Sequence, residues 1–141
     1  MSDMGNKPNV CERSEYKVDD SYIDEAERVM HEGIKVTESR EKLTTTQIRN
    51  VLAMFADIYN DVLGMNTDDD KLNKSICDKI VQLRIRMVYE CGRTPTVKEF
   101  DRCTNIVENI KNIKDSRSQF IKVFHYMEAL VAYHRFYGGK D

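Results

Sequence analysis

The chain has 141 residues, of which 40% are hydrophobic, and it carries a formal net charge of −2. This length suits one hydrophobic core, so we expect a single folded domain. The sequence has no apolar run long enough to cross a membrane, and its N-terminal stretch lacks the basic start and apolar centre of a secretory signal. We therefore expect a cytoplasmic protein with no membrane partner.

The polar N-terminal residues contain glycine and proline and show no periodic pattern. Residues 1–18 are therefore predicted to form a flexible arm, and residues 19–141 a single helical domain. The domain begins with a helix that Ser21 can cap. The predicted inward positions of this helix are Ile23, Ala26, Met30 and Ile34. The charged segment 37–42 that follows is expected to fray.

Two longer helices are predicted in the middle of the chain. Residues 43–64 form a helix that begins behind a threonine cap and stops at Gly64. Its apolar positions are Ile48, Val51, Leu52, Phe55, Ile58, Tyr59 and Val62. An acidic loop leads to a helix within 71–91, with Asp70 as its cap and Gly92 as its stop. The apolar stripe of this helix consists of Ile76, Ile80, Leu83, Met87 and Cys91.

Two further helices complete the predicted fold. Thr96 can cap a fourth helix near 97–112, and a fifth begins around Asp115 or Ser116 and ends before Gly138. The inward residues of the fifth helix are predicted to be Phe120, Val123, Phe124, Met127, Leu130, Val131 and His134. The sequence therefore predicts an all-α protein, a compact bundle of about five helices with short connections.

The sequence offers no recognisable catalytic or metal-binding motif. His125 and His134 are nine residues apart, so on one helix their rings diverge and cannot share a metal ion. The acidic residues 68–70 lack the ligand spacing of a calcium loop, and there is no P-loop, GxSxG or HExxH. A catalytic cysteine stays possible, because its histidine partner need be close only in space, but no cysteine is favoured. We expect no enzyme activity and no cofactor.

The four cysteines are widely spaced and form no CxxC pair. A chain of this length needs no disulfides to stabilise its core, so a disulfide framework is not expected. Cys77 and Cys91 are two heptads apart, which places both thiols near a common face of one helix. We interpret the cysteines as reduced, buried thiols.

The small net charge hides a strong asymmetry along the chain. Residues 1–70 contain 8 Lys and Arg against 16 Asp and Glu, a net charge of −8, whereas residues 71–141 contain 14 against 8, a net charge of +6. The basic half is therefore a candidate surface for an anionic partner. Lys79, Arg86 and Arg93 are seven residues apart and form a predicted ridge on one side of the third helix. Such a ridge can follow phosphates.

Other basic residues stand apart from this ridge. Arg49 is the only basic residue between positions 43 and 70, and it is predicted to be either a buried ion-pair partner or a ligand contact. Arg84 precedes Ile85 on the third helix, while Lys122 and His125 are three residues apart on the last helix. The alternative interpretation is that each cation solvates an outer face or pairs with a nearby carboxylate.

Three stretches of the sequence resemble signature segments of one family: LTTTQIRN, LRIRMVYECGR and YMEALVAYHRFYGGKD. They are similar to the small subunit of the type III-A CRISPR effector, the Csm complex, and the similarity covers residues 43–141 in the same order. The last stretch is the most specific, because EALVAY followed by basic and aromatic residues is not a general helix pattern. The resemblance implies a non-catalytic subunit that stacks in several copies along a crRNA-guided ribonucleoprotein active in antiviral and anti-plasmid defence.

The resemblance also implies the partners: crRNA and target RNA, the backbone and large subunits, and other copies of this chain. Target cleavage would belong to the backbone subunit, and DNA cleavage to the large subunit. Position by position, the family's basic residues correspond to Arg49, Arg84, Arg93 and Arg135. Gln47 and His125 stand where stronger cations are often found in relatives. The full predicted RNA-binding set is Arg49, Lys79, Arg84, Arg86, Arg93, Lys122, His125 and Arg135.

Two other functions fit parts of the same sequence. A protein-only spacer would use the acidic half of one copy to meet the basic half of the next. A helix-turn-helix DNA-binding regulator would use LRIRMVYECGR as its recognition helix. This second alternative is weaker, because the apolar residues of that helix belong to a core, and its basic residues are not gathered at its N-terminal end.

Overall fold

The computed structural model of the chain describes residues 13–34, 42–65 and 69–140. The predicted arm up to residue 12, most of the charged segment 37–42 and part of the acidic loop lie outside these ranges. The described residues form the all-α bundle that the sequence predicts. None of its helices is both long and apolar enough to cross a membrane.

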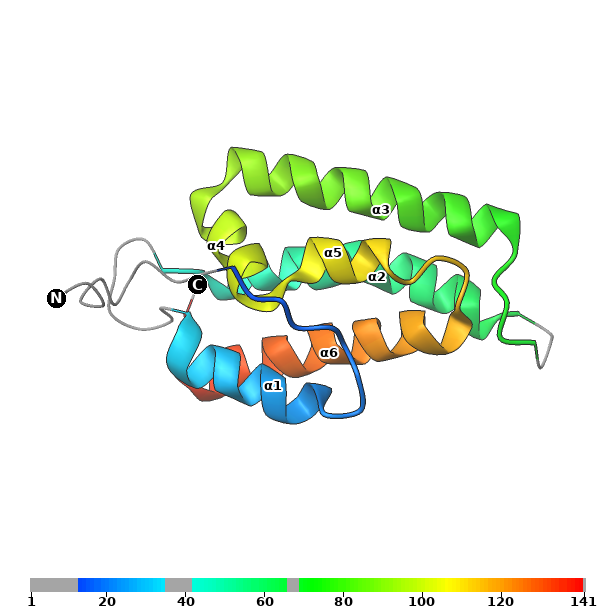
Figure 1. Cartoon of the computed structure of the whole chain (residues 1–141). Helices are drawn as coiled ribbons and strands as arrows, with labels where there is room; N and C mark the ends of the chain where they lie inside the picture. Colours follow the sequence, from blue (N-terminus) through cyan, green and yellow to red (C-terminus); the bar gives the residue numbers. More distant parts are fainter. Residues whose placement is uncertain (1–12, 35–41, 66–68, 141) are drawn as a thin grey trace, which may run out of the picture.

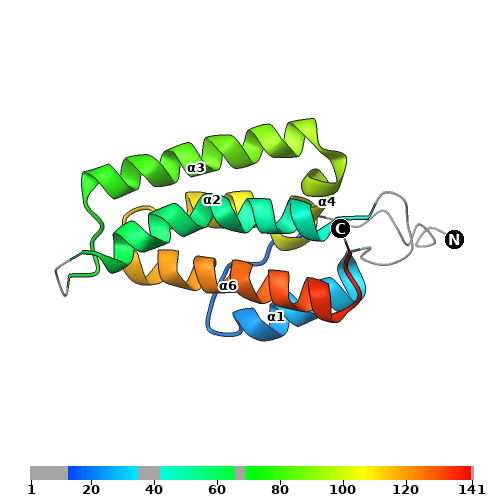
Figure 2. The ribbon, with the colours of Figure 1, turned by 180° about the vertical axis from the view of Figure 1, so that it is seen from behind.

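The bundle is built from α-helices joined by short connections. The elements are α1 (Tyr22–Arg28), the π-helical turn η2 (Val29–Gly33), α2 (Thr45–Leu63), α3 (Lys74–Arg93), α4 (Pro95–Thr104), α5 (Ile106–Lys111) and α6 (Arg117–Phe136). Helix α3 runs along one side of the molecule and α1 along the opposite side, with α2, α5 and α6 between them (Figure 1). Viewed from behind, α2 lies between α3 and α6 (Figure 2).

Helix α6 is the central element of the core. Its buried residues are Phe120, Val123, Phe124, Tyr126, Met127, Leu130 and His134. It packs against both α1 and α2. Ser116 caps its first turn by accepting a hydrogen bond from the Gln119 backbone N–H at 3.1 Å, and Gly138 follows its end with φ 96°. Both ends therefore lie where the sequence predicts them.

Helix α2 begins at a capping box, which confirms the predicted threonine cap. The Thr44 hydroxyl accepts from the Gln47 backbone N–H, and the Gln47 side chain accepts from the Thr44 backbone N–H, each at 3.0 Å. This reciprocal pair satisfies two of the donors that a helix start leaves open. The helix ends at Gly64, also as predicted.

The predicted ends of α3 were wrong. Its cap is Asn73, whose side chain accepts from the Ile76 backbone N–H at 2.9 Å, and the helix continues through Gly92 to Arg93. Asp70 instead accepts hydrogen bonds from the Ser118 backbone N–H at 2.7 Å and from the Ser116 hydroxyl at 3.0 Å. These bonds favour the charged form and lower the pKa of Asp70. Asp70 thus helps to cap α6 rather than α3.

The predicted fourth helix is two helices. Asn105 adopts a left-handed conformation with φ 59° and ψ 33°, and this residue separates α4 from α5. Its side-chain amide donates to the Tyr16 carbonyl at 3.0 Å, and the Asp101 carboxylate accepts from the Val107 backbone N–H at 2.9 Å. Asparagine tolerates this backbone conformation better than most residues, so the break costs little. Thr94, not Thr96, occupies the cap position of α4.

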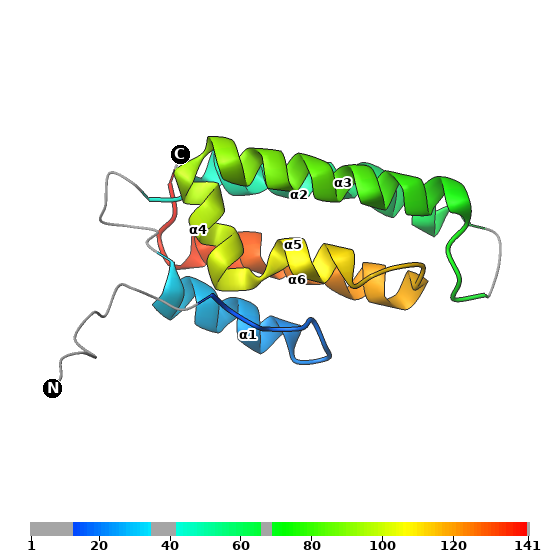
Figure 3. The same ribbon diagram turned by 45° about the horizontal axis from the view of Figure 1, so that its top comes forward.

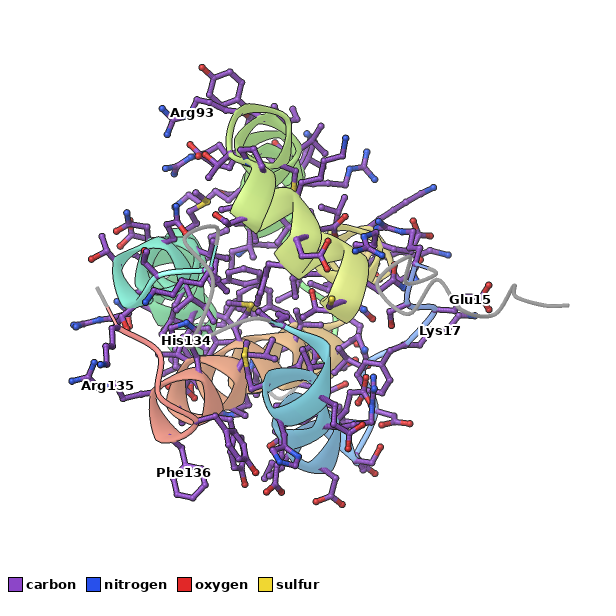
Figure 4. The ribbon with its side chains drawn as sticks, turned by 90° about the vertical axis from the view of Figure 1, so that its left-hand side faces the viewer. Glu15, Lys17, Arg93, His134, Arg135 and Phe136 are labelled. Atoms are coloured by element: carbon purple, nitrogen blue, oxygen red, sulfur yellow. The ribbon has the colours of Figure 1, made fainter. Side chains whose placement is uncertain are left out.

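Residues 13–18, the last part of the predicted arm, are extended and lie against the bundle. The Ser14 N–H donates to the Arg102 carbonyl at 2.8 Å, and the Val18 N–H donates to the Asn109 side chain at 2.8 Å. Val18 is buried, whereas Glu15 and Lys17 point away from the helices (Figure 4). This alternation is typical of an extended segment with one buried side.

The first helix differs from its prediction at two residues. Ile23 was predicted to face inward, but its side chain is 51% exposed. Ser21 makes no side-chain capping bond, because its hydroxyl donates to the Asp19 carboxylate at 2.7 Å instead. Ala26 and Met30 are buried as predicted, and the helix ends in the η2 turn.

The C-terminal segment fixes the start of α2 through His134. The His134 ring is fully buried between α2 and α6 (Figure 4), and its Nε2 donates to the Leu43 carbonyl at 2.8 Å. The backbone of Gly139 lies directly against this ring, and the Lys140 carbonyl accepts from the Thr45 N–H at 2.9 Å. Among the described residues, Nδ1 of His134 has no partner. The ring therefore fits this site in its neutral form.

Burial lowers the pKa of His134 from its ordinary value of 6.5. Since the folded state favours the neutral ring, stability is highest above about pH 6.5 and declines as pH falls towards the folded pKa. We expect the unfolding midpoint in urea to drop between pH 7.5 and pH 5. The variant His134→Gln, which cannot titrate, should lose most of this dependence. His31→Gln at an exposed position should keep it; an equal loss in both variants would contradict the role of His134.

A methyl group at position 139 would overlap the His134 ring. Gly139→Ala is therefore expected to lower the free energy of unfolding by about 2 kcal/mol, the usual cost of forcing atoms into a packed site. Gly92 is the matched control, because a Cβ there meets nothing within 4 Å. Gly92→Ala should raise stability by about 0.5 kcal/mol, since alanine is the better helix former. Equal effects in urea denaturation would refute the close contact.

Candidate nucleic-acid interface

A surface groove lies between α2 and α3, which run side by side (Figures 2 and 3). The groove encloses about 530 Å³. Its polar lining comes from both helices: Gln47, Asn50 and Asp57 on α2, and Arg86, Glu90 and Arg93 on α3. Two arginines therefore share a common space with two amides and with the carboxylates of Asp57 and Glu90. The arginines are the groups there that can bind an anionic group such as a phosphate.

The predicted ridge of three cations lies on the side of α3 that faces α2. Lys79 pairs with Asp61 of α2 at 2.5 Å, and Arg93 pairs with Glu90 at 3.1 Å while lying 6.0 Å from the Tyr89 ring centre. Arg86, between them, is exposed and makes no hydrogen bond or ion pair with another described residue. The cations of both pairs are solvent-exposed and can exchange their carboxylates for other partners.

Arg49 lies on α2, near the groove in sequence but not among its lining residues. It is exposed and has no hydrogen bond or ion pair to another described residue. The prediction of a buried ion pair is therefore wrong. The prediction of a ligand contact stays open for this side chain.

Arg84 belongs to a second groove on the opposite side of α3. This groove, of about 430 Å³, lies between α3 and α5, with Lys111 and Lys114 at its border and Ile80 and Ile110 in its lining. Arg84 and Arg86 are two positions apart on the helix, so they point to different sides of it. They cannot contribute to one phosphate track within a single copy.

The predicted contacts on α6 face other parts of the surface. Lys122 pairs with Asp20 at 3.0 Å, and His125 contacts Glu128 through Nδ1 at 2.8 Å. The His125 ring also lies 5.9 Å from the Tyr59 ring centre. Both side chains thus have intramolecular partners, which lowers the gain from a phosphate contact at either one.

Arg135 is exposed near the end of α6 and donates to the Gly139 carbonyl at 3.1 Å. Figure 4 shows Arg93 and Arg135 both toward the left of the view but on different helices, whereas Arg84 lies on the α5 side of α3 and Lys122 pairs with Asp20. The eight predicted residues therefore do not form one patch. The structure brings together only the ridge Lys79, Arg86 and Arg93 beside α2.

Sequence reasoning did not assign a role to the two amides of the groove. The Gln47 side-chain oxygen accepts from the Thr44 N–H at 3.0 Å and from the Thr96 hydroxyl at 2.8 Å, so it ties the start of α2 to α4. The Thr-x-x-Gln pattern is the signal that predicts the first of these bonds. The bond to Thr96 joins distant segments, and no local pattern could have revealed it.

The groove contains no recognisable metal site or activated thiol. No group of three or more metal-binding side chains occurs within the residues that the structure describes. Cys77, Cys91 and Cys103 are free thiols, but each is only partly buried, so the prediction that they are buried is wrong for these three. Burial raises the pKa of Cys91 to about 11, which disfavours a thiolate at neutral pH. The fold and groove together define a small helical protein with a surface cleft lined by two arginines, two carboxylates and two amides.

Comparison with known proteins identifies the family. A model of the Csm2 type III-A family matches residues 23–140. A protein from Streptococcus thermophilus named CRISPR system Cms protein Csm2 is 38% identical over 123 residues, covering 87% of this chain and 96% of the relative. Proteins of the same name from Mycobacterium tuberculosis and Enterococcus italicus are 32% and 31% identical, covering 88% and 79% of this chain and 97% and 86% of the relatives.

This chain belongs to the Csm2 type III-A family. The resemblance to the small subunit of the type III-A CRISPR effector is thereby confirmed. The match begins at residue 23, whereas the similarity noted in the sequence began at residue 43.

Replacing Gln47 by lysine would add a cation to the groove, and the hydrogen bonds of Gln47 explain what this exchange would cost in stability. Gln47→Lys removes the capping box and places a charge unfavourably near the helix start, so we expect a loss of about 1 kcal/mol in the free energy of unfolding. Asn50→Lys adds the same charge to the groove from a side chain without a hydrogen bond to another described residue. Its stability should be nearly unchanged in urea denaturation. An equal loss in both variants would contradict the capping role.

Proposed function

We propose that this protein is a non-catalytic subunit of a type III-A effector that contacts the crRNA and target RNA through the groove between α2 and α3. The observation that carries this proposal is the ridge of Lys79, Arg86 and Arg93 on the α2 side of α3. Arg86 and Arg93 line the groove, and Arg86 lacks a partner among the described residues. A phosphate can accept from Arg86 directly. Phosphates can replace Asp61, which is exposed, as the partner of Lys79 and the partly buried Glu90 as the partner of Arg93 at modest cost, because Lys79 and Arg93 are themselves exposed.

The groove suits a contact that does not depend on base sequence. Arginine and lysine bind phosphates by charge and geometry, while pairing between guide and target supplies the sequence specificity. A subunit of this kind needs only a stable cationic surface at a fixed position. The rigid helices α2 and α3 provide that surface without a conformational change.

We further propose that several copies stack beside the backbone and large subunits in the cytoplasm. The charge asymmetry of the chain supports the stacking, because acidic and basic surfaces of neighbouring copies attract. The shielded thiol of Cys91 and the buried ring of His134 support a non-catalytic role, since neither is suited to attack a substrate. Cleavage would then belong to other subunits of the assembly.

Photocrosslinking tests the RNA contact. The effector is assembled with this chain, crRNA and a target RNA that carries 4-thiouridine, then irradiated, and crosslinked peptides are mapped by mass spectrometry. We expect crosslinks in peptides that contain Arg86 and Arg93. The double variant Arg86→Gln/Arg93→Gln should lose them and reduce the salt slope of target binding by about one for each phosphate contact removed.

The matched control removes two positive charges elsewhere. Lys17 and Arg28 are exposed residues outside the groove, so Lys17→Gln/Arg28→Gln should leave both crosslinks and salt slope unchanged. An unchanged salt slope in the groove variant, with crosslinks only to other subunits, would refute RNA contact and favour the protein-only spacer. Equal losses of crosslinks and salt slope in both double variants would show that the protein's net charge, and not the groove, causes them.

A further inference from the structure

Helix α3 carries an apolar stripe on its outer face. Val81, Ile85, Val88 and Tyr89 are 48%, 53%, 54% and 66% exposed. They are four of the seven large hydrophobic side chains that are exposed in the described part of the chain. Their spacing places them on one face of the helix, so they form a continuous ridge, which we call the α3 crest.

The α3 crest points directly away from the core. The buried residues of the same helix are Ile76, Ile80, Leu83 and Met87, which face the opposite direction on the helical wheel. Figures 1 and 2 show α3 on the outside of the bundle. The stripe therefore cannot be part of the core, and a contiguous exposed apolar surface of this kind is typical of an interface.

Arginines border the α3 crest on both sides. Arg84 lies on the α5 side, where Lys111 and Lys114 add further positive charge, and Arg86 lies on the α2 side. Neither arginine has a hydrogen bond or ion pair with another described residue. A partner that covers the crest must therefore present apolar side chains in its centre and carboxylates along both edges.

We propose that the α3 crest docks into an apolar groove, bordered by acidic residues, on another protein subunit of the effector. The inference rests on the proposed function, since it assigns the partner to the same assembly. Aliphatic side chains such as Val81, Ile85 and Val88 offer nothing to a phosphate or a base edge. Burying them against a protein is favourable in proportion to the apolar area removed from water.

Charge argues against a second copy as the occupant. If two crests met in antiparallel fashion about Ile85, the Arg84 side chains of both copies would lie along one edge and the Arg86 side chains along the other. Like charges across an interface oppose association. The crest and its borders therefore fit a surface of different composition rather than a copy of themselves.

The proposed docking places the RNA groove at the edge of an interface. Arg86 borders both the α3 crest and the groove between α2 and α3. A subunit seated on the crest would lie beside any phosphates held by Arg86 and Arg93. The RNA would then contact two proteins, and this chain would form one side of the RNA-binding site.

The test is incorporation of crest variants into the effector. The full-length chain carries an affinity tag and is expressed with the other subunits and crRNA, and the recovered subunits are quantified. We expect Ile85→Ser/Val88→Ser to reduce their recovery by about tenfold or more, because truncated anchors at an interface weaken binding by at least this order. The control Ile23→Ser/Leu63→Ser changes two side chains of matched exposure, 51% and 53%, on other helices. It should leave recovery unchanged.

The acidic border is tested by charge reversal. Arg84→Glu should reduce recovery of the other subunits more than Arg84→Gln, whereas Lys17→Glu should have no effect. Circular dichroism and urea unfolding of each purified variant establish that the bundle is intact. Full recovery with the folded crest variant would overturn the proposal. So would a wild-type dimer in light scattering that the crest variant converts to a monomer, because the occupant would then be a second copy.

The two proposals fail in different ways. If the crest binds protein but the groove binds no RNA, the crest variant is lost from the effector while Arg86→Gln/Arg93→Gln leaves crosslinks and salt slope unchanged. If the groove binds RNA but the crest binds no protein, the crest variant assembles fully and keeps its crosslinks. Direct crosslinks from RNA to Tyr89 peptides in the wild type, with unaltered assembly of the crest variant, would assign the crest to RNA instead.

Discussion

The bundle depends on the burial of α6 between α1 and α2, because this contact forms the largest part of the core and fixes both ends of the helix. At its start, Ser116 and Asp70 satisfy the open backbone donors of the first turn. At its end, the buried ring of His134 holds the Leu43 carbonyl. These contacts satisfy backbone groups at the helix start and tie its last turn to α2, whereas the Tyr126 hydroxyl and Nδ1 of His134 have no partner among the described residues.

Since α6 holds α2 in place, α3 can join the bundle through a narrow stripe. Four apolar residues of α3 are buried, and much of its remaining surface faces solvent. A helix that packs against the core on one side and faces solvent on the other holds its exposed side chains in fixed positions for contacts with partners. The groove arginines and the α3 crest both lie on this helix, so one helix presents a cationic surface and an apolar surface at a fixed angle.

Sequence periodicity predicted the fold well wherever the determining contacts are local. The caps at Thr44 and Ser116 act within one helical turn, and the sequence predicted a threonine cap for α2 and a start around Asp115 or Ser116 for α6. The sequence misplaced Asp70 because its partners lie 46 and 48 residues away, and it missed the break at Asn105 because that amide bonds to the distant Tyr16. Ile23 followed the helical period, yet no neighbouring element covers it.

The same distinction explains what sequence could say about the site. Heptad spacing alone aligned Lys79, Arg86 and Arg93, and the structure has them on one side of α3. Spacing could not reveal that Asp61 pairs with Lys79, since Asp61 lies on another helix, whereas the pairing of Arg93 with Glu90 is a local contact between residues three apart. Spacing also did not show that Arg84 and Arg86 belong to different grooves, so both were predicted to contact the same RNA. Net charge over half a chain therefore makes the basic half a candidate surface for an anionic partner, while pairing and helix face decide which cations could reach such a partner.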